Sequence, residues 1–245
     1  MAKKNKLRTD NIVDCACVIH GNGYNWEYVE KLYNMLTRII PTGIRFHVYT
    51  EHDRSVPPHM IKHILEDWGI SGPKKSWWYK LQLFNPEHHL GDLLYLDLDV
   101  VIVRELDFIQ ALDTNYLWTI RDFRYLQRKA YSTVNSSMMW FNVAKFSSVW
   151  EKFKSGTIQQ IIKSYPGDQD YIAAMVDHNN RRFFEDRYFE SYRWQCLDGG
   201  YDFAKRQFRK PGSGLKISAE TAVVVFHGTP KPHQIHDPEI SNLWC

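Results

Sequence analysis

An apolar run interrupted by two aspartates constrains this chain more than any other feature. Residues 92–103 read DLLYLDLDVVIV, so that two continuous apolar stretches flank Asp97 and Asp99. Such stretches are typical of strands that are buried on both faces of a sheet. Leaving two bare carboxylates among them would be very costly, so these side chains must have partners.

Apolar runs and helical periods alternate along the rest of the chain. Short apolar runs predict further strands at residues 12–19, 44–49, 117–120, 137–141 and 221–226. Apolar residues at helical spacing predict helices at about residues 26–40, 60–68, 77–84, 146–153, 158–162 and 169–176. This alternation predicts an α/β fold with a mixed, mainly parallel sheet flanked by helices. Ligands of such sheets bind beyond the carboxyl ends of the strands.

The spacing of the two aspartates favours a metal site. On an extended chain, residues two apart project from the same side, so Asp97 and Asp99 would converge. Two carboxylates suit a hard cation such as Mn²⁺ or Mg²⁺. Such a cation would bridge the phosphates of a nucleotide diphosphate and neutralise the departing charge. The alternative is that one aspartate caps the next turn while the other is solvated, which the flanking apolar residues disfavour.

The composition is that of a globular protein and excludes several functional classes. The 245 residues are 44% hydrophobic and 24% charged, enough for one large α/β domain. No stretch of about 18 apolar residues occurs, so neither a membrane span nor a signal peptide is expected. Residues 1–10 are basic without interleaved aromatic residues, which predicts a flexible solvated tail rather than a nucleic-acid site. The four cysteines form neither a disulfide framework nor a zinc pattern, so a reducing cytoplasm is expected.

Further polar motifs accompany the aspartate pair in a fixed order. They are Lys80 in Tyr79-Lys80-Leu81, Asp122, Asn135-Ser136-Ser137, Gly167-Asp168-Gln169-Asp170, and the segment His227-Gly228-Thr229-Pro230-Lys231-Pro232. With Asp97-Leu98-Asp99, they resemble glycosyltransferase family 8 over about residues 12–232. This family has the GT-A fold and includes glycogenin and bacterial lipo-oligosaccharide galactosyltransferases. Two departures are that Ser137 stands where the family has glycine, and that His227 lies four rather than six residues before Lys231.

The resemblance implies a single GT-A-like domain over residues 11–245. Its nucleotide-sugar half would span about 11–125 and its acceptor-side half about 126–245. The implied reaction moves a hexosyl group from a nucleotide-sugar, expected to be a UDP-sugar, to an unidentified glycan, protein or small-molecule acceptor. Anomeric configuration would be retained. No nucleic-acid partner is expected.

The resemblance also assigns roles to individual residues. The metal, Mn²⁺ or Mg²⁺, would be bound by Asp97, Asp99 and His227. Donor binding would involve Lys80 and Lys231 at the phosphates, Gly228 in the same segment, and Asp122, Asn135 and Asp168 at the sugar. Gln169 or Asp170 would lie near the anomeric carbon. Tyr24 is expected either to stack on the donor base or to pack in the core.

Other interpretations stay open at this point. Asp-x-Asp after an apolar strand is also typical of haloacid-dehalogenase-like phosphatases, in which Asp97 would be the nucleophile, although Val100 stands where that family has glycine. A non-catalytic carbohydrate-binding relative is a third candidate. Asp168 could serve only as a helix N-cap. His88 and His89 are expected to be solvated. The aromatic residues of 183–194 are expected to pack in the core or to contact an acceptor. Residues 206–215 are expected to form a basic loop.

Overall fold

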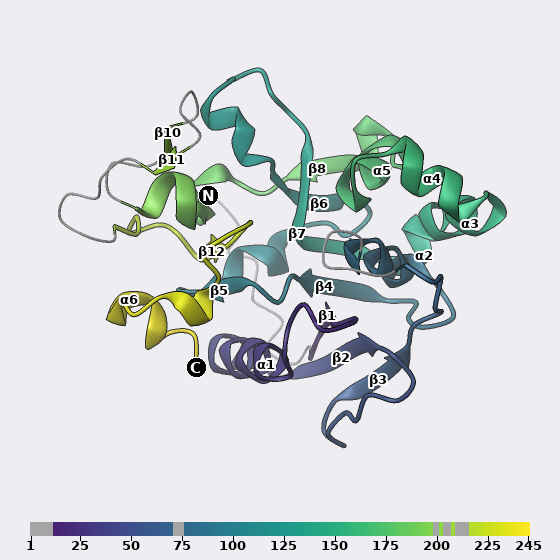
Figure 1. Cartoon of the computed structure of the whole chain (residues 1–245), viewed down its shortest axis with the longest axis horizontal. Helices are drawn as coiled ribbons and strands as arrows, with labels where there is room; N and C mark the ends of the chain where they lie inside the picture. The colour runs from purple at the N-terminus through teal and green to yellow at the C-terminus, as the bar shows by residue number, and fades with distance from the viewer. Residues whose placement is uncertain (1–11, 71–75, 198–200, 203–206, 209–215) are drawn as a thin grey trace, which may run out of the picture.

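A seven-stranded mixed sheet forms the centre of the fold, as seen in the computed structural model, which describes residues 12–70, 76–197, 201–202, 207–208 and 216–245 (Figure 1). Its strand order is β3-β2-β1-β4-β7-β6-β8. Strand β7 runs antiparallel to β4 and β6, whereas the other four pairings are parallel. The strands are β1 (Val13–Val18), β2 (Ile44–Thr50), β3 (Ile61–Ile64), β4 (Asp92–Leu96), β6 (Leu117–Arg121), β7 (Val134–Asn142) and β8 (Arg181–Phe183).

The two faces of this sheet carry separate hydrophobic cores. Cys15 and Cys17 of β1 point into one core, and Ala16 between them points into the other, as the two-residue period of a strand requires. The first core is covered by α1 (Glu27–Ile39), whose buried residues recur at helical spacing. The second core is covered by η1 (Ser76–Phe84), α2 (Val143–Phe146), α3 (Ser148–Ser155) and α5 (Asp168–Met175) (Figure 1).

The predicted helix at residues 60–68 is wrong. Residues Ile61–Ile64 form the edge strand β3, which pairs in parallel with β2 in the register Thr50↔Ile64. The apolar spacing of Met60, Ile64 and Trp68 resembles a helical period, but pairing with the exposed edge of β2 determines the local structure. The predicted helix at 77–84 is present as the 3-10 helix η1, in which all residues from Trp78 to Phe84 are buried.

A second, three-stranded sheet continues from the first. It has the order β5-β12-β9 and comprises β5 (Val100–Ile102), β12 (Val223–Val225) and β9 (Phe189–Ser191). The chain therefore leaves the main sheet after Leu96 and enters the second sheet at Val100. Asp97 and Asp99 lie at this junction rather than within one continuous strand.

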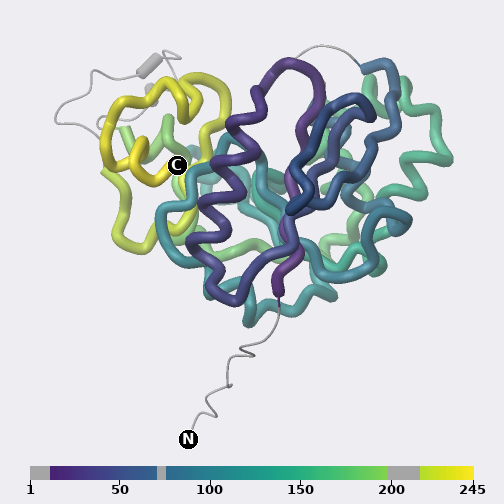
Figure 2. Tube along the Cα trace, turned by 90° about the horizontal axis from the view of Figure 1, so that it is seen from below, coloured from purple at the N-terminus to yellow at the C-terminus, as the bar shows by residue number. Residues whose placement is uncertain are grey.

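The C-terminal segment packs beside α1, more than 200 residues away in sequence (Figure 2). Tyr28 is hydrogen-bonded to His233, and Lys31 donates to the Trp244 carbonyl at 3.2 Å. This packing fixes the segment after β12 against the first half of the chain.

The remaining helical elements are η2 (Asp107–Ala111), η3 (Phe123–Leu126), α4 (Ile158–Ser164), η4 (His178–Asn180), η5 (Asp186–Tyr188), the π-helix η6 (Tyr192–Cys196), η7 (Pro232–Gln234) and α6 (Pro238–Ser241). The short strand β10 (Tyr201–Asp202) pairs with β11 (Gln207–Phe208).

Two predicted features lie wholly or mostly outside the described residues, namely the tail at 1–10 and the loop at 206–215. In the part of the chain that the structure describes, no helix has the length and apolar character needed to cross a bilayer. The division into a nucleotide-sugar half and an acceptor-side half stays a prediction.

Candidate functional site

A cleft of about 370 Å³ opens at the junction of the two sheets, beyond the carboxyl ends of β1 and β4. This is where ligands of α/β sheets bind. Seven of the residues predicted for a donor and metal site line it: Tyr24, Lys80, Asp97, Asp99, His227, Gly228 and Lys231. Segments up to about two hundred residues apart in sequence thus converge on one cavity.

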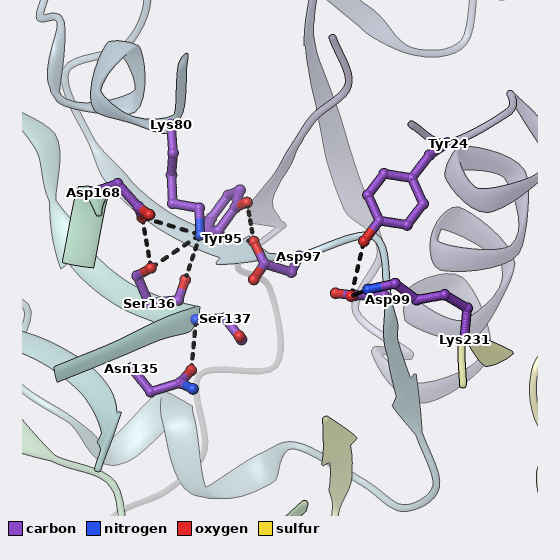
Figure 3. A network of polar contacts seen from close by, with 10 residues as sticks. All are labelled: Tyr24, Lys80, Tyr95, Asp97, Asp99, Asn135, Ser136, Ser137, Asp168 and Lys231. Atoms are coloured by element: carbon purple, nitrogen blue, oxygen red, sulfur yellow. Dashed lines mark hydrogen bonds and ion pairs between the residues drawn. The ribbon is translucent and has the colours of Figure 1, made fainter. Parts of the chain in front are cut away.

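Asp97 is held from two sides at the end of β4 (Figure 3). Its Oδ1 accepts hydrogen bonds from the Lys80 ammonium at 2.8 Å and from the Tyr95 hydroxyl, while its backbone N–H donates to the Ser137 carbonyl at 2.8 Å. Burial alone would raise the pKa of the Asp97 carboxyl, but the positive charge of Lys80 and these hydrogen bonds lower it below its usual value. Asp97 is therefore ionised at neutral pH, with 24% of its side chain exposed.

Lys80 connects Asp97 to a second carboxylate. Its ammonium lies 3.3 Å from Oδ2 of Asp168 and donates to Oγ of Ser136 at 3.0 Å. The Ser136 hydroxyl in turn donates to Asp168 at 2.7 Å. Only 6% of the Lys80 side chain is exposed, and both carboxylates raise its pKa despite burial. The ammonium therefore stays charged and is compensated by two anions, as a buried charge requires.

Asp99 has a separate set of partners. Its Oδ2 accepts from the Tyr24 hydroxyl at 2.8 Å and from the Lys231 ammonium (Figure 3). Burial raises the pKa of the Asp99 carboxyl, Lys231 offsets this only in part, and the negative charge of Asp97 adds to the rise. Ionised Asp99 is thus the least well compensated of the carboxylates in the cleft.

His227 and Gly228 follow the second sheet and form the opposite wall. The His227 imidazole is hydrogen-bonded to the Ser191 hydroxyl at 2.6 Å, and Trp194 packs edge-on against it at 4.6 Å. Burial, together with the charge of Arg193, lowers the pKa of His227 to about 4, so it is neutral at neutral pH. Gly228 has φ +77°, a backbone conformation that favours glycine.

The residues predicted to orient the sugar lie next to the cleft but do not line it. Asp122 caps η3 by accepting from the Arg124 N–H at 2.9 Å, and Gln169 Nε2 lies 3.3 Å from its other oxygen. Asn135 accepts from the N–H of Ser137, a cleft residue, at 2.9 Å. Burial raises the pKa of Asp170. These contacts bring the three predicted segments together around Asp168, although Asp168 itself does not use its side chain as an N-cap.

The predicted metal ligands share the cleft but are not gathered into one cluster. Among the described residues, Asp97, Asp99 and His227 do not form a group with ligand atoms close enough to hold one ion. Each carboxylate is instead paired with a lysine ammonium. The two carboxylates and the neutral imidazole fit a hard divalent cation in their chemistry. A cation held here would share the Asp99 carboxylate with the Lys231 ammonium or displace it.

Several cleft residues were not singled out by the sequence analysis. Tyr95 lies two residues before Asp97 and so faces the same side of β4, a signal that the sequence contains. His20 stacks on Tyr79 at 3.7 Å, and the half-exposed Trp77 lines the mouth. Most aromatic residues of 183–194 pack in the core, including Phe184, Phe189 and Tyr192.

Comparisons with known proteins agree with this fold. No protein-family model and no curated protein match the chain. The structure of the galactosyltransferase LgtC with donor and acceptor sugar analogs superposes with a TM-score of 0.63 and 16% identity, covering 95% of each chain. Apo GlyE of Streptococcus pneumoniae TIGR4 superposes with a TM-score of 0.59 and 18% sequence identity, and the match covers 91% of this chain and 56% of GlyE. The bifunctional glycosyltransferase WbbM superposes with a TM-score of 0.57 and 13% sequence identity, and the match covers 91% of this chain and 47% of WbbM. The predicted resemblance in fold is confirmed, and the chain spans about half of the two larger proteins.

Glu51, which follows β2, anchors the loop that leads from His20 to Tyr24. Its carboxylate accepts from the Gly21 N–H, from the Thr50 hydroxyl at 2.9 Å and from Arg54 at 3.0 Å. Burial alone would raise the pKa of Glu51, but these hydrogen bonds lower it from 4.5 to about 2. The ionised carboxylate thus stabilises the loop that forms one wall of the cleft.

We expect Glu51→Gln to lower the free energy of unfolding at pH 7 by about 1–2 kcal/mol. The loss would be larger for a fully buried carboxylate, but a quarter of the Glu51 side chain is exposed, so solvent screens its interactions. Since the folded-state pKa is depressed, this stabilisation is complete above pH 4.5 and is lost as pH falls towards 2. Denaturant unfolding of both proteins between pH 7 and 3 measures the difference, with the exposed Glu105→Gln as control. A difference that does not shrink below pH 4.5 would contradict the role of the ionised carboxylate.

Proposed function

We propose that this protein is a metal-dependent glycosyltransferase that uses a nucleotide-sugar, with UDP as the expected nucleotide. The observation that carries the proposal is the pair of aspartate–lysine contacts facing one cleft, Asp97 with Lys80 and Asp99 with Lys231. Both pairs lie where the main sheet ends, in a fold shared with solved glycosyltransferases. LgtC was solved with donor and acceptor sugar analogs, which supports a sugar donor and a sugar acceptor for this chain.

A bound diphosphate would rearrange the partners of Asp99. Mn²⁺ or Mg²⁺, held by Asp97, Asp99 and His227, would supply Lewis-acid stabilisation of the departing diphosphate. Lys231 is the more exposed of the two cleft lysines, with 25% of its side chain accessible against 6% for Lys80. Released from Asp99, its ammonium could contact a phosphate oxygen instead. Positive charge placed there stabilises the leaving group most as the glycosidic bond breaks.

The rest of the network would hold the sugar. Lys80 fixes Asp97 and Asp168 relative to each other, and the Ser136 hydroxyl completes that triangle. We assign sugar hydroxyl contacts to Asp122, Asn135 and Asp168, and a position near the anomeric carbon to Gln169 or Asp170. Retention of configuration is proposed from the resemblance to glycosyltransferase family 8. The acceptor is a glycan, protein or small molecule that would enter beside the half-exposed Trp77.

Two other functions are less well supported. The matched structures named above are all glycosyltransferases, so the phosphatase alternative gains nothing from the fold. In a phosphatase, Asp97 would attack phosphorus, yet its Oδ1 is engaged by both Lys80 and Tyr95. A carbohydrate-binding protein without activity would have no need of two lysine–carboxylate pairs in one cleft.

We expect UDP with Mn²⁺ to raise the melting temperature by roughly 5–10 °C at a hundred times its dissociation constant. UDP with a chelator should give far less, because the diphosphate would then meet Asp97 and Asp99 without a bridging cation. Differential scanning fluorimetry with UDP, ADP and GDP, each with and without Mn²⁺, measures both nucleotide preference and metal dependence. Equal shifts with and without metal would refute metal-bridged donor binding.

We expect Asp99→Asn to abolish the Mn²⁺-dependent shift and sugar transfer while leaving the apo protein as stable as before or about 1 kcal/mol more stable. The raised pKa means that ionised Asp99 costs stability at neutral pH, so removing its charge relieves that cost. Chemical unfolding of apo protein and nucleotide-sugar hydrolysis provide the two measurements, with the exposed Asp53→Asn as control. A loss of several kcal/mol in the apo variant would instead make Asp99 a structural residue.

Lys231→Ala and His227→Ala should differ in their response to metal. Lys231→Ala removes charge from the leaving group and should lower kcat about tenfold or more without rescue by added Mn²⁺. His227→Ala removes a neutral ligand and should weaken Mn²⁺ binding, so that activity partly recovers at high Mn²⁺. Hydrolysis of the donor, titrated with Mn²⁺, separates the two. A His227→Ala titration identical to wild type would exclude His227 as a ligand.

A further inference from the structure

A second cluster of ligating side chains lies at the other end of β1. Asp14 is the second residue of this strand, six residues before His20 at the cleft, a span of about 20 Å on extended chain. Asp14, His47 of β2 and His89 of the loop before β4 bring ligand atoms within 4.8 Å of one another. In the part of the chain that the structure describes, it is the one such group of three, and none of its members lines the cleft.

The positions of these side chains follow from the register of the sheet. Asp14 pairs with Arg45 and Ala16 with His47, so Asp14 and His47 project from the same face of neighbouring strands. Nε2 of His47 lies 2.9 Å from Oδ1 of Asp14, and Nε2 of His89 lies 4.0 Å from Oδ2. The prediction that His88 and His89 are solvated is wrong, since both are half-buried beside the strands. The ring of His89 lies against that of His47. The ring of His88 lies against those of His63 and Tyr49.

A hydrogen bond behind His47 orients its ring towards Asp14. Nδ1 of His47 lies 2.8 Å from Nε2 of His63, which belongs to β3. In the metal-free structure Nε2 of His47 donates to Asp14. A bound cation would take the place of that proton, and Nδ1 of His47 would then donate to His63. An outer hydrogen bond of this kind is the usual support of a metal-bound histidine.

Arg45 is the competing partner of Asp14. Its guanidinium donates to both carboxylate oxygens at 2.6 Å. Its side chain is 56% exposed, however, so it can withdraw into solvent when a cation arrives. Asp14 is only 10% exposed and cannot move with it. The carboxylate, with four lone-pair sites, can also keep one arginine hydrogen bond while it binds a metal.

We propose that Asp14, His47 and His89 form a second metal site, distinct from the cleft, for a borderline transition cation of the Zn²⁺ class. Two imidazoles and one carboxylate suit Zn²⁺, Co²⁺ or Ni²⁺, whereas Mg²⁺ and Mn²⁺ prefer oxygen ligands. Water would complete the coordination at the exposed side. The ion would tie β1, β2 and the loop before β4 together, behind the strands that carry the cleft residues.

The test is Zn²⁺ and Co²⁺ binding to tag-free protein without any nucleotide. We expect one Zn²⁺ per chain at this site by isothermal titration calorimetry, and Co²⁺ should give visible absorption bands characteristic of coordination by nitrogen and oxygen. His89→Gln, a change in a loop, should lower the affinity for Zn²⁺ at least tenfold, because even loss of an outer hydrogen-bond partner of a metal ligand typically lowers metal affinity 10–100-fold. His47→Gln should do the same and should abolish the Co²⁺ bands.

Two control variants identify which site is titrated. His178→Gln alters an exposed histidine, 80% exposed, and should bind Zn²⁺ as wild type does. Asp99→Asn alters the cleft and should also leave the Co²⁺ bands unchanged. Wild-type protein without Co²⁺ bands, or a His89→Gln variant that binds Zn²⁺ as tightly as His178→Gln, would overturn the proposal. Loss of the bands in Asp99→Asn would assign the ion to the cleft and would equally overturn it.

Discussion

The cleft depends on one buried ammonium. Lys80 lies between the carboxylates of Asp97 and Asp168 at 2.8 and 3.3 Å, with the Ser136 hydroxyl closing the arrangement. Without that charge, two carboxylates would lie close together in a site with little access to water, at a cost of several kcal/mol. Lys80 belongs to η1, Asp97 to the end of β4 and Asp168 to the start of α5. The ion cluster therefore links η1 and α5 to the carboxyl end of β4, the central strand of the sheet.

The two lysines of the cleft differ in a way that suits different tasks. Lys80 is almost fully buried and has three side-chain partners, so it acts as a permanent part of the scaffold. Lys231 is more exposed. Its ammonium pairs with Asp99, donates to the Phe226 carbonyl at 3.3 Å and lies 5.4 Å from the centre of the Tyr24 ring. Under the proposed function, Lys80 would stay in place while Lys231 would be the lysine that exchanges Asp99 for a phosphate oxygen.

Much of the fold could be predicted from local patterns, and the failures have physical reasons. The apolar runs at β1, β4 and β12 and the helical period of α1 were sufficient, because burial on one or both faces leaves a clear signal. Strand β3 was misread because an edge strand is defined by its partner rather than by its own sequence. Seven of the residues predicted for the site line the cleft, whereas Asp122, Asn135 and Asp168 lie beside it, and the roles of all of them stay predictions. The sequence could not show that each aspartate pairs with its own lysine, or that Asp14, His47 and His89 meet, because both depend on strand register and loop placement.

The contact between Asp99 and Lys231 joins residues 132 positions apart, and it is closed by the segment that packs beside α1 at the end of the chain. Contacts of such long range are made late, because the entropy of closing the loop must be overcome first. The wall of the cleft that carries Lys231 is thus completed by the segment after β12. A chain that has not yet been completely synthesised presents Asp97 with its partner Lys80 but leaves Asp99 without Lys231. A form of the chain that ends before Lys231 would therefore keep the pair of Asp97 and Lys80, but the Asp99 carboxylate would keep only the Tyr24 hydroxyl as its hydrogen-bond partner among the described residues.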